Sequence, residues 1–180
     1  QNDKALAAIE TARASNPDDV GLIITAANIY FELDNKEAFK LAMSEAIEKE
    51  PNNPVLYYNL GVVSGELGEK EAAVSYYEKS IELDPSNENS YLNLVALILD
   101  GEQEIVNEMN NLGTSRSDNL RYDELKKVRE DLYKQCVPIL KDLIAINNNV
   151  EAIRTLMNIY GTLGDNPGYV EMRNLLDQQE

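Results

Sequence analysis

Few side chains in this sequence are of the kinds that carry out catalysis. The 180 residues contain no His, which is the commonest general base and metal ligand, and only one Cys, Cys136. Cys136 falls on an apolar stripe with no basic cluster evident to activate it, so we expect a buried packing thiol. The acidic clusters at 18–19 and 102–104 lack the spacing of a calcium loop. With no phosphate loop, metal constellation or catalytic triad in view, we predict no enzyme and no cofactor.

The polar side chains with the most suggestive spacing are amides. Asn59 and Asn93 lie 34 positions apart. A side-chain amide offers a donor and an acceptor together, which matches the two groups of a peptide bond. A row of such residues would hold an extended backbone with little regard to its side chains. The alternative, that these Asn are ordinary exposed polar residues, stays open at this point.

The charge of the chain narrows the class of partner. It has 32 acidic and 16 basic residues, for a formal net charge of -16. Such a surface repels phosphate backbones and anionic lipid headgroups, so we expect neither nucleic acid nor a membrane as partner. No apolar run approaches the length of a membrane span, so no membrane insertion is expected in this segment. Neutral or basic proteins are the better hypothesis.

The sequence does not identify the cellular compartment of the protein. One Cys cannot form an internal disulfide, so the sequence does not report redox conditions. The chain starts with Gln1 instead of Met and opens directly into helical pattern, so we interpret it as a piece of a longer protein. Our first hypothesis is an exported or periplasmic bacterial protein, and the alternative is a cytoplasmic one.

The elements that position these residues recur with a period of 34. Pro17, Pro51 and Pro85 are spaced by this amount. The same shift superposes further pairs: Tyr57 and Tyr91, Leu60 and Leu94, Leu33 and Leu67, Ile47 and Ile81. Each period reads as two amphipathic helices, the first ended by Gly at a position such as Gly68 and the second stopping before Pro. We therefore predict an all-α solenoid of antiparallel helix pairs without strands.

One period resembles a known family. It carries Tyr57, Leu60-Gly61, Ala73, Tyr77 and Pro85, which resemble the pattern of the tetratricopeptide repeat; Ser64 and Ser80 depart from it. The resemblance implies a right-handed superhelical solenoid that binds other proteins, but it names no partner. On this reading 1–180 is a single solenoid, divided into a half repeat at 1–17, repeats at 20–53 and 54–87, an extended repeat at 88–148, and a degenerate repeat at 150–180.

The extended repeat contains 29 residues more than the period requires. We predict one lengthened helical hairpin, with continuous helices at 98–112 and 121–136 that pack on each other. Its two apolar stripes are Ile98, Ile105, Met109 and Leu112, then Leu125, Val128, Leu132 and Cys136. Ser117 or Asp118 is expected to cap the second arm, and Pro138 to kink it. The segment 109–115 resembles one in bacterial tetratricopeptide-like proteins.

The resemblance also implies a concave groove lined by the first helix of each pair. Carried over to this sequence, the predicted groove residues are Asn28, Phe31, Tyr58, Asn59, Glu66, Asn89, Asn93, Arg154 and Asn158. Glu32 and Glu66 would favour a partner with Lys or Arg side chains. Some family members clamp a C-terminal carboxylate with basic residues, but Asn89 and Asn93 stand at the corresponding basic positions here. We therefore expect an extended peptide or a helix as ligand, and not a carboxylate-clamped tail.

A second function class also fits the sequence. The helix predicted at 4–14 lacks a preceding partner, which would leave Leu6 and Ile9 partly uncovered. The chain would then be a structural assembly module that self-associates through this open repeat face or through the long hairpin. An exposed apolar stripe near the hairpin tip would favour this class over the groove.

Overall fold

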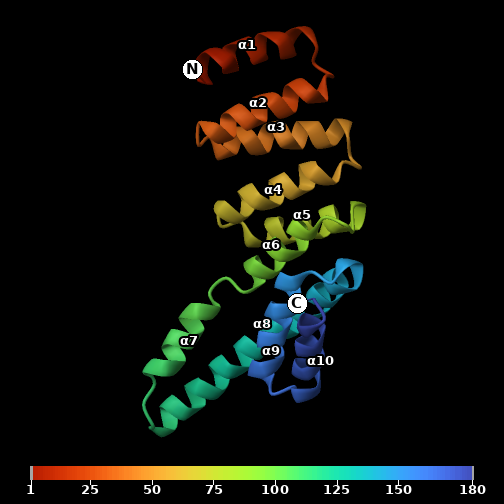
Figure 1. The fold of residues 1–180 in the computed structure, drawn as a ribbon. Coiled ribbons are helices and arrows are strands. Elements are labelled where there is room, and N and C mark those ends of the chain that lie inside the picture. The colour runs from red at the N-terminus through yellow and green to blue at the C-terminus, as the bar shows by residue number, and fades with distance from the viewer. Residues whose placement is uncertain (1, 180) are drawn as a thin grey trace. The chain divides into compact units, whose positions relative to one another are not determined.

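The computed structural model describes residues 2–179, and every regular element in that range is an α-helix (Figure 1). The prediction of an all-α chain is confirmed. The chain divides into two compact units, Gln1–Ser90 and Tyr91–Glu180. The helices of the described range are α1 (Asn2–Ser15), α2 (Val20–Glu32), α3 (Lys36–Lys49), α4 (Pro54–Glu66), α5 (Lys70–Leu83), α6 (Glu88–Ile98), α7 (Glu102–Asn111), α8 (Arg116–Asn147), α9 (Val150–Leu163) and α10 (Asn166–Asp177).

In the first unit, α1 to α5 stack one after another (Figure 1). Their ends follow from local chemistry. The side chains of Asp19, Asn35 and Asn53 cap α2, α3 and α4 by accepting backbone N–H groups that have no partner within the helix. Gly68 follows the end of α4, as predicted. Its φ of 77° is left-handed, a conformation that ends an α-helix and that Gly adopts readily. The largest fully buried side chains of this unit are Ile23, Met43, Leu56, Leu60, Val63, Ser64 and Ser80.

The two Ser departures from the repeat pattern are both buried. Ser80 satisfies its hydroxyl by donating to the carbonyl of Pro54 at 3.0 Å and by accepting from Ser90 at 2.9 Å. A hydroxyl therefore replaces the usual methyl group without leaving a polar atom unpaired there. These bonds tie the start of α4 and the start of α6 to α5.

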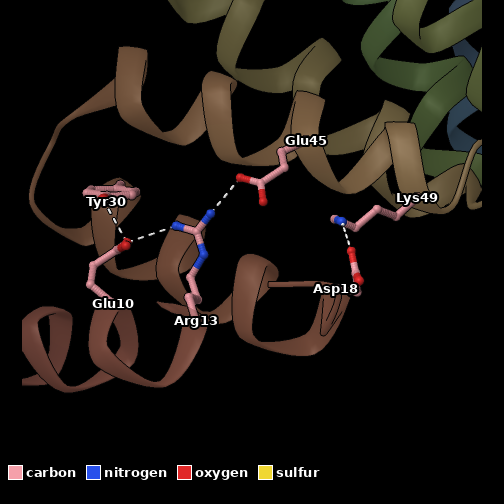
Figure 2. Close-up of polar contacts among 6 residues, drawn as sticks. All are labelled: Glu10, Arg13, Asp18, Tyr30, Glu45 and Lys49. Atoms are coloured by element: carbon pink, nitrogen blue, oxygen red, sulfur yellow. Dashed lines mark hydrogen bonds and ion pairs between the residues drawn. The ribbon is translucent and has the colours of Figure 1, made fainter. Parts of the chain in front are cut away.

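A polar cluster holds α1 against the next two helices (Figure 2). The guanidinium of Arg13 donates to Glu10 at 2.9 Å and to Glu45 of α3 at 2.5 Å. The Tyr30 hydroxyl of α2 donates to the same Glu10 carboxylate at 3.0 Å. Burial, with help from this hydrogen bond, raises the pKa of the Tyr30 hydroxyl. Side chains of three helices therefore meet around Glu10 and the partly buried guanidinium of Arg13.

The N-terminal helix extends slightly beyond the predicted 4–14. Leu6 and Ile9 on it are half-buried, which agrees with the partial exposure expected for a helix with a neighbour on one side only. An ion pair of 2.5 Å between Lys49 and Asp18 adds a second link between α3 and the loop after α1 (Figure 2). Self-association through this face stays a prediction.

The second unit departs from the predicted hairpin in its first arm. A continuous helix over 98–112 is wrong: α6 ends at Ile98, and α7 begins only at Glu102. Gly101 separates the two helices with φ of 89°, a left-handed conformation that interrupts an α-helix. The sequence signal was the Asp100-Gly101 dipeptide, a common turn former.

The second arm is longer than predicted, because α8 runs from Arg116 to Asn147. Its cap is Ser115, so the prediction of Ser117 or Asp118 is wrong. The backbone N–H of Asp118 donates to the Ser115 hydroxyl at 3.1 Å, and the backbone N–H of Ser115 donates back to the Asp118 carboxylate at 3.2 Å. This reciprocal pair is a capping box. The helix continues through Pro138, and a kink there stays a prediction.

The apolar stripe of α8 was also partly misassigned. Leu125 and Cys136 are buried as expected, but Val128 is 50% exposed, and Tyr133 is buried instead. The face toward α7 is polar at this level. Arg129 donates from Nε to Glu102 at 2.6 Å, and the Tyr133 hydroxyl donates to the same carboxylate at 2.7 Å. The α7–α8 contact therefore depends on a hydrogen-bonded ion pair as well as on apolar packing.

Loss of this carboxylate should loosen α7. We expect Glu102→Ala to speed hydrogen exchange of the α7 amides by roughly tenfold, since a partly buried guanidinium and a phenol would lose their shared acceptor. Glu104→Ala is the matched control: Glu104 lies in the same first turn, so both changes remove one charge near the helix N-terminus, but Glu104 is exposed. Equal exchange in the two variants would show that the ion pair does not hold α7.

The last two helices form a tight pair around fully buried Ile153 and Leu156. Gly168 of α10 lies against the Tyr160 ring, and a Cβ at this Gly would stand 2.7 Å from the ring. Gly164, with φ of 72°, ends α9. These helices occupy the range in which the sequence placed the degenerate C-terminal repeat.

Candidate functional site

Four of the nine predicted groove residues meet in one concavity of the first unit. We call it the α2–α4 pocket, and its volume is about 270 Å³. It is lined by Asn28 and Phe31 of α2, Phe39 of α3, and Tyr58, Asn59, Val62 and Val63 of α4. The amides therefore stand beside an apolar floor in a hollow of the surface.

Helical spacing and aromatic packing position this lining. Asn28 and Phe31 lie three residues apart on α2 and so share one face of the helix. The Phe31 ring tilts against Phe39, with ring centroids 5.6 Å apart, and Tyr58 packs on Tyr77 at 6.1 Å. Phe39 and Tyr77 are core residues, so they hold the two half-exposed rings in place. The aromatic part of the pocket is therefore preformed.

The two amides differ in exposure but share one chemical role. Asn28 is exposed, and Asn59 is half-buried at the pocket wall. Among the described residues, neither side-chain amide has a hydrogen-bond partner, so both can accept from and donate to a ligand. An apolar hollow with a few converging polar groups is the usual form of a binding site.

The predicted groove acids are less free than expected. Glu66 forms an ion pair of 3.1 Å with Lys36, the first residue of α3. The hydrogen bond to Glu66 raises the pKa of the Lys36 ammonium, although partial desolvation opposes it. Glu32 accepts a hydrogen bond from the Asn2 amide at 3.0 Å. Sequence spacing did not reveal either partner, because each comes from a different helix.

The remaining predicted residues lie outside this pocket. Asn89 is exposed near the start of α6, in the first unit. Asn93 is half-buried and belongs to the second unit, as do Arg154 and Asn158, which are exposed and one turn apart on α9. The row formed by Asn59 and Asn93 therefore stays a prediction.

Phe39 and Val63 belong to the pocket but were not among the predicted groove residues. The signal for Phe39 was present, because the positions 34 residues before and after it hold Ala5 and Ala73. A large ring at a position where the neighbouring repeats have a methyl group fills space between α2 and α4. Val63 gave no such signal, since it reads as an ordinary core residue and is buried like one.

The single thiol and the carboxylates are the other side chains that could carry chemistry. Cys136 is buried, and burial raises the pKa of its thiol to about 11, so it packs as a small apolar group. Within residues 2–179, among the side chains that the structure describes, no three His, Cys, Asp or Glu are grouped so as to hold a metal ion. No helix of that range combines the length and apolar character needed to cross a bilayer.

Comparisons with known proteins agree on the architecture. Residues 55–87 match the family model for the tetratricopeptide repeat. None of the curated proteins matches the sequence. Among solved structures, MamA is 16% identical with a TM-score of 0.63, over 97% of this chain and 80% of that one. A protein from Bacteroides ovatus, described as a putative protein binding protein, is 21% identical with a TM-score of 0.64, over 92% and 91%.

A third solved structure contains a ligand. It is the first tetratricopeptide domain of Spaghetti (RPAP3), bound to an HSP90 peptide. It is 18% identical to this chain with a TM-score of 0.50, over 81% of this chain and 95% of that one. At these identities the likeness to all three structures concerns the fold alone.

Proposed function

We propose that this chain, a tetratricopeptide repeat protein, binds an extended peptide segment of a partner protein in the α2–α4 pocket. The observation that carries the proposal is the meeting of two unpaired amides, Asn28 and Asn59, over a floor of aromatic and Val side chains. The bound peptide of the Spaghetti domain supports this reading, since it places a peptide on a related fold.

The chemistry of the pocket suggests how the ligand lies. Asn59 and Asn28 pair with backbone N–H and C=O groups of the peptide, which requires no particular side chain there. The hollow beside them takes one large apolar side chain. Its volume of about 270 Å³ greatly exceeds the roughly 10–15 Å³ that a single water needs. Affinity then comes mainly from the apolar anchor, and the amides fix its register.

Charge selects among such peptides. The first unit contains 17 acidic residues and 7 basic ones, so its field favours encounter with a neutral or basic segment. Because Glu66 is already paired with Lys36, this preference acts through the whole unit more than through one groove acid. Binding should therefore weaken with added salt, which screens such charges.

The amide pair provides the direct test. With a partner segment identified by capture, calorimetry of the Asn28→Ala, Asn59→Ala double variant should show a loss of about 1–3 kcal/mol, since ligand backbone groups lose their partners. The fold should survive, because neither residue is buried. Asn52→Ala, at an exposed Asn in the turn before α4, is the control and should bind as the parent does. Unchanged affinity in the double variant would contradict the proposal.

A second candidate function has one observation in its favour. Leu120 and Val128 of α8 are 59% and 50% exposed and lie eight residues apart, on one face of the helix. This is the exposed apolar stripe that an assembly module acting through the hairpin would have. Sedimentation of the intact chain over a range of concentrations tests this candidate, and a monomer throughout would exclude self-association.

A further inference from the structure

The basic residues of this acidic chain are concentrated in one helix. Of the 16 Lys and Arg in the chain, α8 holds seven: Arg116, Arg121, Lys126, Lys127, Arg129, Lys134 and Lys141. The same helix holds six of the 32 acidic residues. Elsewhere acids outnumber bases by far. A ligand that the rest of the surface repels can therefore approach α8.

A hollow of the second unit lies against two of these cations, Lys126 and Arg129. We call it the α8 pocket, and its volume is about 120 Å³. It is lined by Met109 of α7, by Tyr122, Lys126, Arg129, Glu130 and Tyr133 of α8, and by Thr162 and Leu163 of α9. One water needs roughly 10–15 Å³, so the hollow has room for several non-hydrogen atoms of a ligand.

The cation in this pocket is fixed in orientation. Arg129 donates from Nε to Glu102 at 2.6 Å, and its guanidinium carbon lies 5.2 Å from the centroid of the Tyr133 ring. Tyr133 is itself fixed by donating to Glu102 at 2.7 Å. A guanidinium held through Nε still carries N–H groups on its two Nη atoms, which form the fork that matches a carboxylate. Little side-chain entropy is then lost when a ligand binds.

The second cation lies at the rim and is weakly paired. The ammonium of Lys126 stands 4.0 Å from Glu130, and the side chain of Lys126 is 61% exposed. Glu130 is shared with Lys134, also at 4.0 Å. An exposed pair at this separation contributes little, so Lys126 can turn to a ligand. The lining of the pocket therefore holds two cations and one acid, Glu130, while Glu102 pairs with Arg129 from outside the lining.

We propose that the α8 pocket binds an acidic side chain from a peptide segment of a partner protein. Arg129 holds the carboxylate, Lys126 closes over it, and Met109, Tyr122 and Leu163 contact the methylene groups and the next apolar residue. The charge preference is opposite to that proposed for the α2–α4 pocket. The two sites lie in different units and share no residue, so either proposal can fail without the other.

A pair of capped peptides tests the proposal on the intact chain. The probes are an acetylated and amidated pentapeptide of alternating Glu and Leu and its counterpart with Gln in place of Glu. In amide NMR spectra, the Glu peptide should give saturating shifts at Tyr122, Lys126 and Thr162. The Gln peptide should not. Equal binding of both probes, or no saturating shift with the Glu peptide, would overturn the proposal.

Two neighbouring Lys supply the matched variants. Lys126→Gln should weaken binding of the Glu peptide by about fivefold or more, because a charge-assisted contact is lost. Lys127→Gln removes the same charge one residue further along, but Lys127 does not line the pocket, so its effect should stay within about twofold. Both Lys are exposed, so the fold should be intact. Equal losses would mean attraction to α8 in general and no built site. Shifts at the same amides on concentrating the protein alone would identify a second copy as occupant and also overturn the proposal.

Discussion

Replacing Gly61 by Val is expected to lower the free energy of unfolding by about 3 kcal/mol, at the upper end of the cost of overpacking a core. A Cβ at this position would stand 2.7 Å from two atoms of the Tyr77 ring. Tyr77 is only 5% exposed and packs on Tyr58, so its ring has no free space to enter. Relief requires α4 and α5 to separate, which would open the core of the first unit. Urea unfolding followed by far-ultraviolet circular dichroism measures the change.

Gly161→Ala is the control for the loss of a helical Gly. Its nearest neighbour is the Tyr169 ring at 3.5 Å, which is ordinary contact, so this variant should be neutral or more stable by about 0.5–1 kcal/mol. Combining Gly61→Val with Tyr77→Ala should cost less than the sum of the two changes, because the clash is shared. Strict additivity would show that the ring is not what Gly61 accommodates.

The parts of the fold that sequence predicted best are those fixed by local chemistry. Gly68 and Pro85 each end a helix through backbone conformation, and α4 and α5 end just before them, as expected. The close approach at Gly61 follows from local pattern too, because Tyr77, the large residue that it meets, belongs to the same repeat. A small residue facing a large one in the same repeat leaves a pattern that is visible without any knowledge of distant partners.

The hairpin was predicted less well because its packing is polar. A stripe of apolar residues assigned Val128 to the α7–α8 interface, but Arg129 and Glu102 meet there instead. The sequence offers several acids and several bases in these helices, and only the folded geometry decides which two pair. Gly101 indicated a break in the helix, but the apolar spacing on both sides of it favoured one continuous helix.

The candidate site was also predicted only in part. Asn28, Phe31, Tyr58 and Asn59 line one pocket, and these positions could be carried over from the repeat. The pairing of Glu66 with Lys36 could not, since it joins residues 30 positions apart in different helices. The electrostatics of a repeat surface depend on such long-range pairs, which the repeat pattern does not specify.

The thiol of Cys136 is expected to react with a disulfide reagent at pH 8 about 100-fold more slowly in the folded chain than in the unfolded one, from ionisation alone. Burial raises its pKa from the ordinary 9.0 to about 11, and below both values each unit lowers the thiolate fraction tenfold. Restricted access slows the reaction further, because the side chain is fully buried.

The raised pKa of Cys136 also affects stability, because the folded state keeps the thiol proton to a higher pH than the unfolded state does. The contribution to stability is thus complete below pH 9 and is lost as the pH rises toward 11, where the unfolded thiol has already ionised.

Labelling kinetics at several pH values, in buffer and in urea, measure both effects. The folded rate should keep rising up to about pH 11, whereas the urea rate should level off near pH 9, since each follows its own thiolate fraction. The control is an exposed thiol in the same chain, made by Ser117→Cys with Cys136→Ser, which should react alike in both solvents. If Cys136 in the folded chain reacts as fast as that control, α8 must open readily around Leu140 and Leu143, and the buried face of this helix would be a dynamic surface instead of a core.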